Sequence, residues 1–134
     1  MEFQCDPTSR VPIYRQLMDQ VRQAVARGRL RPGTRLPSVR QLSRELVVNP
    51  NTVAKSYTEL ERDGVLNTRQ GLGVFVAEPQ DDLSAAARRE RFAEALDRFL
   101  TEAVHLGFSA DEVVAAVAKR IKGFQFAGAA STDN

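Results

Sequence analysis

Residues 38–76 read SVRQLSRELVVNPNTVAKSYTELERDGVLNTRQGLGVFV. Apolar residues recur at helical spacing on both sides of a short polar turn, and two strand-like runs follow around a pair of glycines. A short helix, a turn, a second helix and a hairpin, in this order, are typical of a winged helix-turn-helix. In that arrangement the second helix enters the major groove of DNA and the hairpin reaches its flank.

The first helix of this stretch is predicted to begin at Ser38. Ser is a favourable N-cap and Gln41 follows three residues later, so we expect a reciprocal capping box in which each residue satisfies a backbone N–H of the other. The apolar residues Val39, Leu42 and Leu46 then share one helix face. This face is short because the helix is short.

The second helix is predicted to begin after Asn49, a strong N-cap, with Pro50 at the first helical position, where its missing N–H removes no hydrogen bond. Asp63 and Gly64 end the helix, and Gly64 suits a left-handed residue just past its end. The buried stripe consists of Val53, Tyr57 and Leu60.

Asn51, Thr52 and Lys55 remain near the exposed N-terminal end of the second helix. Asn pairs bidentately with adenine, and Thr bonds a base edge or touches a thymine methyl. We therefore assign base reading to Asn51 and Thr52, a phosphate or guanine contact to Lys55, and a phosphate contact to Arg40. The alternative is that Asn-Pro-Asn-Thr serves only as a capping sequence.

The hairpin is predicted from the β-forming runs 65–69 and 74–76, joined by residues 70–73. Gly71 and Gly73 permit the positive φ that a tight hairpin loop needs. A phosphate-cradling loop would open a helix, whereas here the chain enters another strand. Arg69 and Gln70 at the tip are expected to contact sugar-phosphate or the minor groove; otherwise they are solvated hairpin residues.

Before this stretch, apolar residues at every fourth position predict one more helix, beginning after Pro12 and ending around Arg27 and Gly28. Its apolar positions are Ile13, Leu17, Val21 and Val25. Arg35 and Leu36 are expected to form a short strand that pairs with the wing.

Charge is concentrated in the same region. The chain of 134 residues has a net charge of +2, yet residues 10–78 carry 12 Lys and Arg against 6 Asp and Glu. A local excess of positive charge is what phosphate binding requires. His105 is the single histidine and Cys5 the single cysteine. We therefore predict no metal site, no cofactor, no disulfide within the chain and no enzymatic active site.

Residues 79–83 are predicted to be a linker, residues 84–123 a helical region and residues 124–134 a disordered tail. In the helical region a long apolar stripe stops at Gly107. Ser109 and Glu112 then form a capping box for a second helix, which Gly123 ends and which turns Val113, Val114, Val117 and Ile121 inward.

A helical hairpin cannot cover so long an apolar stripe with its own second helix. We therefore expect homodimerisation through this region; the alternative is packing against the winged domain. The expected dimer residues are Phe92, Leu96, Phe99, Leu100, Ala103, Leu106, Val113, Val117 and Ile121.

Residues 12–78 resemble the DNA-binding domain of the GntR family of bacterial transcription regulators. The resemblance is carried by these motifs: Pro12-Ile13-Tyr14, Gly33-Thr34-Arg35-Leu36-Pro37-Ser38, Asn49-Pro50-Asn51-Thr52-Val53, Tyr57, Glu59-Leu60-Glu61, Asp63-Gly64 and Gly71-Leu72-Gly73-Val74-Phe75-Val76. The Asn-Pro-Asn-Thr sequence and the short remainder are similar to the YtrA-type subgroup, whose small C-terminal helical part dimerises.

The resemblance implies that DNA contacts lie at Arg40, Asn49, Asn51, Thr52, Lys55, Arg69, Gly71 and Gly73. It also suggests control of transporter genes. Ala54 stands where larger subgroups often carry an Arg, so base preference cannot be transferred from them.

The sequence thus predicts a mainly α fold with a small β-wing, in which a winged helix-turn-helix at residues 10–78 precedes a C-terminal helical hairpin. The predicted function is a homodimeric transcription regulator, a repressor that binds a palindromic operator in double-stranded DNA. The alternative is a protein-interaction module that uses the winged scaffold without specific DNA binding. Residues 1–9 are too polar for a signal sequence and no run approaches the ~18 apolar residues of a membrane span, so we expect the cytoplasm. The helical part offers too few convergent polar groups for a recognisable effector pocket; the alternative is a pocket enclosed between the helices of two chains, and the sequence does not identify a small-molecule effector.

Overall fold

The computed structural model describes residues 2–79 and 85–126, which form two compact units. The first unit comprises the described residues up to Pro79 together with Gln125 and Phe126, and the second comprises residues 85–124. Most of the predicted linker and residues 127–134 of the predicted tail lie outside the described residues. At residue 125, the backbone N–H donates to the carbonyl of Ala26 over 2.6 Å.

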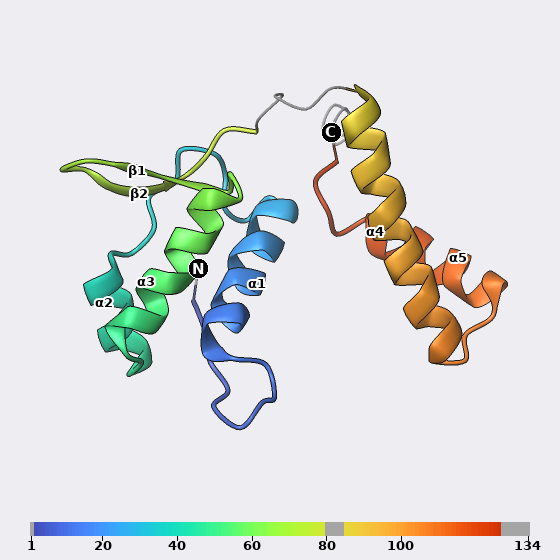
Figure 1. Cartoon of the computed structure of the whole chain (residues 1–134), viewed down its shortest axis with the longest axis horizontal. Helices are drawn as coiled ribbons and strands as arrows, with labels where there is room; N and C mark the ends of the chain where they lie inside the picture. Colours follow the sequence, from blue (N-terminus) through green and yellow to red (C-terminus); the bar gives the residue numbers. More distant parts are fainter. Residues whose placement is uncertain (1, 80–84, 127–134) are drawn as a thin grey trace. The chain divides into compact units, whose positions relative to one another are not determined.

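The first unit contains three helices followed by a hairpin: α1 (Ile13–Ala26), α2 (Val39–Leu46), α3 (Pro50–Arg62), β1 (Leu66–Arg69) and β2 (Gly73–Val76). In Figure 1, α1 and α3 run side by side, while α2 and the hairpin lie on the other side of α3. This is the winged helix-turn-helix order that the sequence predicts.

Aliphatic side chains from every element of this unit meet in one core. Removing each from water stabilises the fold by about 1.5–3 kcal/mol. Val25, expected in the buried stripe of α1, is only partly buried, whereas Ala24 beside it is fully buried. The largest of the fully buried apolar side chains are Leu17, Val21, Leu42, Val53, Leu60, Leu66 and Val76.

The wing is an antiparallel pair whose register runs from Leu66 opposite Val76 to Arg69 opposite Gly73. Gly73 therefore belongs to β2 rather than to the loop in which the sequence analysis placed it. The predicted pairing of Arg35 and Leu36 with the wing is confirmed, as an isolated bridge and not as a strand: Arg35 forms a bridge with Phe75, and the Leu36 N–H donates to the Val74 carbonyl over 2.8 Å.

The helix caps follow the local sequence with one exception. Ser38 Oγ accepts from the Gln41 N–H over 3.0 Å, but the Gln41 side chain donates to Glu45 over 3.2 Å instead of returning to Ser38. The second half of the predicted capping box, in which the Gln41 side-chain oxygen would accept from the Ser38 N–H, is therefore wrong. The charge-assisted bond from the Gln41 NH2 group to the Glu45 carboxylate turns the amide along the helix instead. At the start of α3, Asn49 Oδ1 accepts from the Asn51 N–H over 2.8 Å.

The second unit consists of α4 (Ala85–His105) and α5 (Ala110–Ile121). The capping box between Ser109 and Glu112 is fully formed. With a rise of about 1.5 Å per residue, α5 is about 18 Å long and α4 about 32 Å, so α5 cannot cover α4 along its length.

One expectation for this unit is wrong in the single chain. Of the α5 residues expected to face inward, Val113 is half-buried, but Val114, Val117 and Ile121 are exposed. The end of the helix agrees with the sequence: α5 ends at Ile121, Lys122 is its C-cap and Gly123 follows.

Within residues 2–79 and 85–126, no helix combines the length and apolar character that crossing a membrane requires.

Candidate nucleic-acid interface

The N-terminal end of α3 presents polar side chains to solvent, while one face of the helix is buried in the core. Asn51 and Lys55 are exposed and Thr52 is half-buried, whereas Val53, Tyr57 and Leu60 are buried. A helix oriented in this way offers the donors and acceptors of its first turn to a base-pair edge. Asn49 differs from these residues, because its side-chain oxygen already caps the helix.

Tyr57 fixes α3 relative to the start of α2. Its hydroxyl donates to the Pro37 carbonyl over 2.7 Å, one residue before the Ser38 N-cap. Burial, and to a lesser extent the negative charge of Glu45, raises the pKa of the Tyr57 phenol above its usual value. The neutral, hydrogen-bonded phenol is therefore the form that the fold stabilises.

Lys55 is positioned by an aromatic ring that the sequence analysis did not connect with it. Its ammonium nitrogen lies 4.0 Å from the centre of the Tyr14 ring in α1. A cation over an aromatic face is attracted to the ring's negative quadrupole. The ring therefore restrains Lys55 on the side of α3 nearest α1. No local pattern could reveal the pair, since the two residues lie on different helices.

The turn between α2 and α3 contains a strained residue. Val47, the C-cap of α2, has φ 53° and ψ 53° and is 90% exposed. A β-branched residue in the left-handed region is a genuine outlier. The strain sits where the chain reverses between the two helices, so it contributes to setting their relative direction. Arg40, on the first turn of α2, is exposed.

The wing carries the remaining predicted contact residues. Arg69, Gln70 and Gly71 are exposed, and Gly71 has φ 79° in the loop. The Arg69 guanidinium carbon lies 4.5 Å from the centre of the Phe75 ring, which holds the side chain along the sheet. Gly73 has φ 124°, a conformation that L side chains rarely adopt.

All nine predicted DNA-contact residues lie on α2, α3, the residue that caps α3, or the hairpin, and so within the first unit. The structure thus brings them to three adjoining elements of one compact body (Figure 1). Asn49 has a capping role, and the structure describes no hydrogen bond from the other six side chains, those of Arg40, Asn51, Thr52, Lys55, Arg69 and Gln70.

The second unit exposes a row of large apolar side chains along α4 and α5. Ala103 alone among the predicted dimer residues is buried within the single chain, at 7% exposure, and Val113 is half-buried. An exposed apolar row of this length on a small helical unit is unusual unless another surface covers it. The exposed members are Phe92 (70%), Leu96 (41%), Phe99 (46%), Leu100 (40%), Leu106 (64%), Val117 (37%) and Ile121 (46%).

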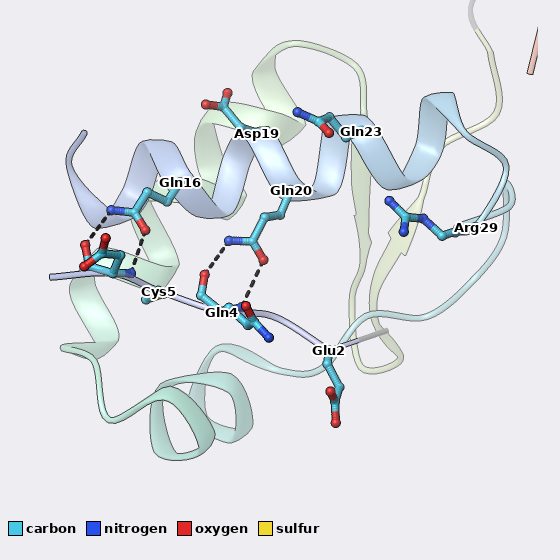
Figure 2. A pocket seen from close by; sticks show the side chains of 9 residues that line it. Glu2, Gln4, Cys5, Gln16, Asp19, Gln20, Gln23 and Arg29 are labelled. Carbon is cyan, nitrogen blue, oxygen red and sulfur yellow. Dashed lines mark hydrogen bonds between the residues drawn. The ribbon is translucent and has the colours of Figure 1, made fainter. Parts of the chain in front are cut away.

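The N-terminal segment lies along α1 and borders a polar groove of about 750 Å³. Figure 2 shows Gln16 and Gln20 pointing from α1 toward this segment, where Gln20 bonds both backbone groups of Gln4 and Gln16 bonds those of Asp6. Both glutamine side chains therefore have their hydrogen-bond partners within the chain, and these bonds attach the N-terminal segment to α1. Among residues 2–79 and 85–126, no group of three or more His, Cys, Asp or Glu residues is placed to hold a metal ion.

Comparison with known proteins agrees with this geometry. Residues 13–76 match the family described as bacterial regulatory proteins, gntR family. The HTH-type transcriptional repressor YtrA of Bacillus subtilis (strain 168) is 34% identical over 111 residues, which make up 83% of this chain and 85% of that protein.

Two solved structures are similar in fold. A transcriptional antiterminator from Listeria monocytogenes EGD-e has a TM-score of 0.75 and 31% identity, with 90% of each chain covered. AraR(DBD) in complex with operator ORX1 has a TM-score of 0.50 and 25% identity, covering 57% of this chain and 100% of that chain. The similarity to the Listeria protein extends beyond the winged unit.

Proposed function

The chain belongs to the GntR family of bacterial regulatory proteins, and from this premise we propose that it is a homodimeric repressor that binds a two-fold symmetric DNA operator. Its family and its relatives are DNA-binding transcription regulators. We propose in addition which residues contact the bases, that two chains pair, that the protein represses transcription, and that its targets are transporter genes.

The observation that carries the proposal is the N-terminal end of α3. Asn51 and Lys55 are exposed there, while the Tyr57 hydroxyl donates to the Pro37 carbonyl over 2.7 Å and so fixes the same helix. A rigidly held helix end with an exposed Asn is suited to bidentate recognition of adenine. The similar AraR domain is bound to an operator, which supports the same use of this unit.

The contacts divide by chemistry. We assign base edges to Asn51 and Thr52, and phosphate or guanine to Lys55 and Arg40. The wing residues Arg69, Gln70, Gly71 and Gly73 meet the backbone or minor groove beside the reading helix, and Asn49 serves this interface by capping α3.

The exposed apolar row of the second unit supports the dimer. In a symmetric dimer the same patch on each copy covers the other, so residues such as Phe92 and Phe99 are buried in both copies. Two paired winged units would meet half-sites about 10 base pairs apart, or a multiple of that, on one side of the duplex. The name of the similar Bacillus subtilis protein supports repression.

Selection of bound duplexes from a random pool with the full chain tests recognition and pairing together. We expect a two-fold symmetric consensus with half-site centres about one helical turn, or a multiple of it, apart. A consensus without symmetry would contradict the dimer. A mobility shift with genomic fragments at two salt concentrations separates the alternative function: a protein that shifts no fragment even at low salt would be a protein-interaction module, not a DNA-binding regulator.

Asn51→Ala is the matched variant for the reading helix. Each good bidentate base contact contributes ~1–3 kcal/mol of discrimination, and the variant dimer loses one in each half-site. The ratio of affinities for selected and random duplexes should therefore fall at least about 30-fold while the dimer persists. An unchanged ratio would refute the role of Asn51. Immunoprecipitation of protein-bound chromosomal DNA would show whether the operators lie beside transporter genes, as the resemblance to the YtrA-type subgroup suggests.

A further inference from the structure

The wing is built from three chain segments rather than two. Besides β1 and β2, residues 34–36 run along β2: the Leu36 N–H donates to the Val74 carbonyl over 2.8 Å, and the Val76 N–H donates to the Thr34 carbonyl over 2.9 Å. Arg35 forms an antiparallel bridge with Phe75. Arg35 is therefore a residue of the wing sheet, although it precedes the hairpin by some thirty residues in the sequence.

Pairing places two arginines on the same face of this sheet. Residues opposite each other in an antiparallel pair point to the same side, as do alternate residues of one strand. Arg69 is opposite Gly73, Gly73 and Phe75 alternate along β2, and Phe75 is opposite Arg35. All four residues therefore share one face.

Side-chain positions agree with this register. The Arg69 guanidinium lies over the Phe75 ring at 4.5 Å. A Cβ atom added to Gly73 would lie 2.9 Å from Arg35 Nε, so the Arg35 side chain passes across the space that Gly73 leaves open. The absence of a side chain at Gly73 thus makes room for a second guanidinium beside the first.

The charge of this sheet is of one sign. Residues 31–38 and 64–76 contain three charged residues, and all are arginines: Arg31, Arg35 and Arg69. Arg35 is exposed and forms no salt bridge with the part of the chain that the structure describes. Two guanidinium groups held on one face without a carboxylate between them favour an anion that bonds both, and Arg presents donors matched to phosphate oxygens.

We propose that Arg35 is a DNA-contacting residue of the wing, which binds a backbone phosphate together with Arg69. This inference rests on the proposed function. Arg35 lies across the face of the sheet and not at the hairpin tip. It is therefore placed to contact the sugar-phosphate backbone of the duplex and not to insert into the minor groove. It positions the wing on any sequence and does not read bases.

Salt dependence of binding tests the proposal. The probes are a fluorescein-labelled duplex recovered by the selection described above and a random duplex of equal length, titrated with the full chain at several salt concentrations. Loss of one phosphate contact lowers the slope of log K against log salt by about 0.9. A dimer carries two copies of Arg35, so Arg35→Gln should lower the slope by about 1.8 and weaken binding to both duplexes by the same factor, roughly 10- to 100-fold at ~0.15 M salt.

Arg31→Gln is the matched control, because it removes the same charge from the preceding turn. We expect it to leave the slope nearly unchanged, while Arg35→Lys retains most of the wild-type slope. A loss of stability alone would not move the slope, and thermal unfolding of each variant checks the fold. Gly73→Ala should displace the Arg35 side chain, so its effect on affinity should be smaller in the Arg35→Gln background than in the wild type.

Equal slopes for Arg35→Gln and Arg31→Gln would overturn the inference while leaving the proposed function intact. A loss confined to A·T-rich flanks would also overturn it, because it would place Arg35 in the minor groove. Failure of the wild-type chain to bind either duplex would instead refute the proposed function itself.

Discussion

Tyr57 allows a quantitative test of how the two helices of the reading motif are held together. The variant is Tyr57→Phe, which removes only the hydroxyl that donates to the Pro37 carbonyl over 2.7 Å. At neutral pH the variant should be less stable by about 1 kcal/mol, the usual net contribution of one hydrogen bond. The ring still fills its place in the core, so no cavity is formed.

The pH dependence gives the sharper result. The pKa of Tyr57 is raised in the folded protein above its ordinary value of 10.0, so the stability that comes from the neutral phenol is fully present below pH 10. Above that pH the unfolded chain releases the phenolic proton while the folded protein keeps it, and the wild type loses up to about 1.4 kcal/mol per pH unit. The loss continues until the folded pKa is reached.

At pH 11 this loss amounts to about 1.4 kcal/mol, which exceeds the ~1 kcal/mol contributed by the hydrogen bond. The two proteins should therefore have equal stability near pH 10.5–11, and Tyr57→Phe should be the more stable one above it. Urea unfolding at closely spaced pH values measures the difference, and every other titrating group is shared by both proteins. A difference that stays constant from pH 8 to pH 11.5 would refute the burial of a neutral, hydrogen-bonded phenol.

Three further substitutions test separate parts of the structure. Asn49→Ala should lower the stability to urea by about 1 kcal/mol, because the Asn51 N–H loses its cap, and no change would contradict the 2.8 Å bond. Val47→Asn should raise stability by about 1 kcal/mol, since Asn tolerates the left-handed conformation that strains Val; a less stable variant would show that Val47 contributes packing instead. Phe99→Glu should raise the dimer dissociation constant at least about 100-fold in sedimentation equilibrium, because the change counts twice in a symmetric dimer. Thr101→Glu adds the same charge elsewhere on α4 and should leave the dimer intact; equal effects would argue against the apolar row as the interface.

The helices and their ends could be predicted from sequence because their causes are local. Ser38, Asn49 and Ser109 cap the next few N–H groups, Pro50 fits only the first helical turn, and Gly64 adopts φ 81° just beyond α3. Failures arose where a second local partner competed. The Gln41 side chain donates to Glu45 instead of accepting from the Ser38 N–H, because two local partners compete for the orientation of one amide.

Exposure in the C-terminal unit could be predicted only in part. Periodicity identified the apolar row of α4, but it could not show that Ala103 is covered within the chain or that Val114 stays 68% exposed. Those outcomes depend on the tertiary surroundings of each side chain and not on spacing along one helix.

The sequence by itself determined which segments become helices and strands and which residue types stand at the end of α3, because capping, periodicity and backbone preference act within a few residues. Only the tertiary structure decided which distant groups meet. Lys55 over Tyr14, Tyr57 on Pro37, and Arg35 across Gly73 beside Arg69 and Phe75 are contacts between separate elements. They exist because burial of the shared core aligns α1, α3 and the wing, and that alignment is a property of the whole packed unit.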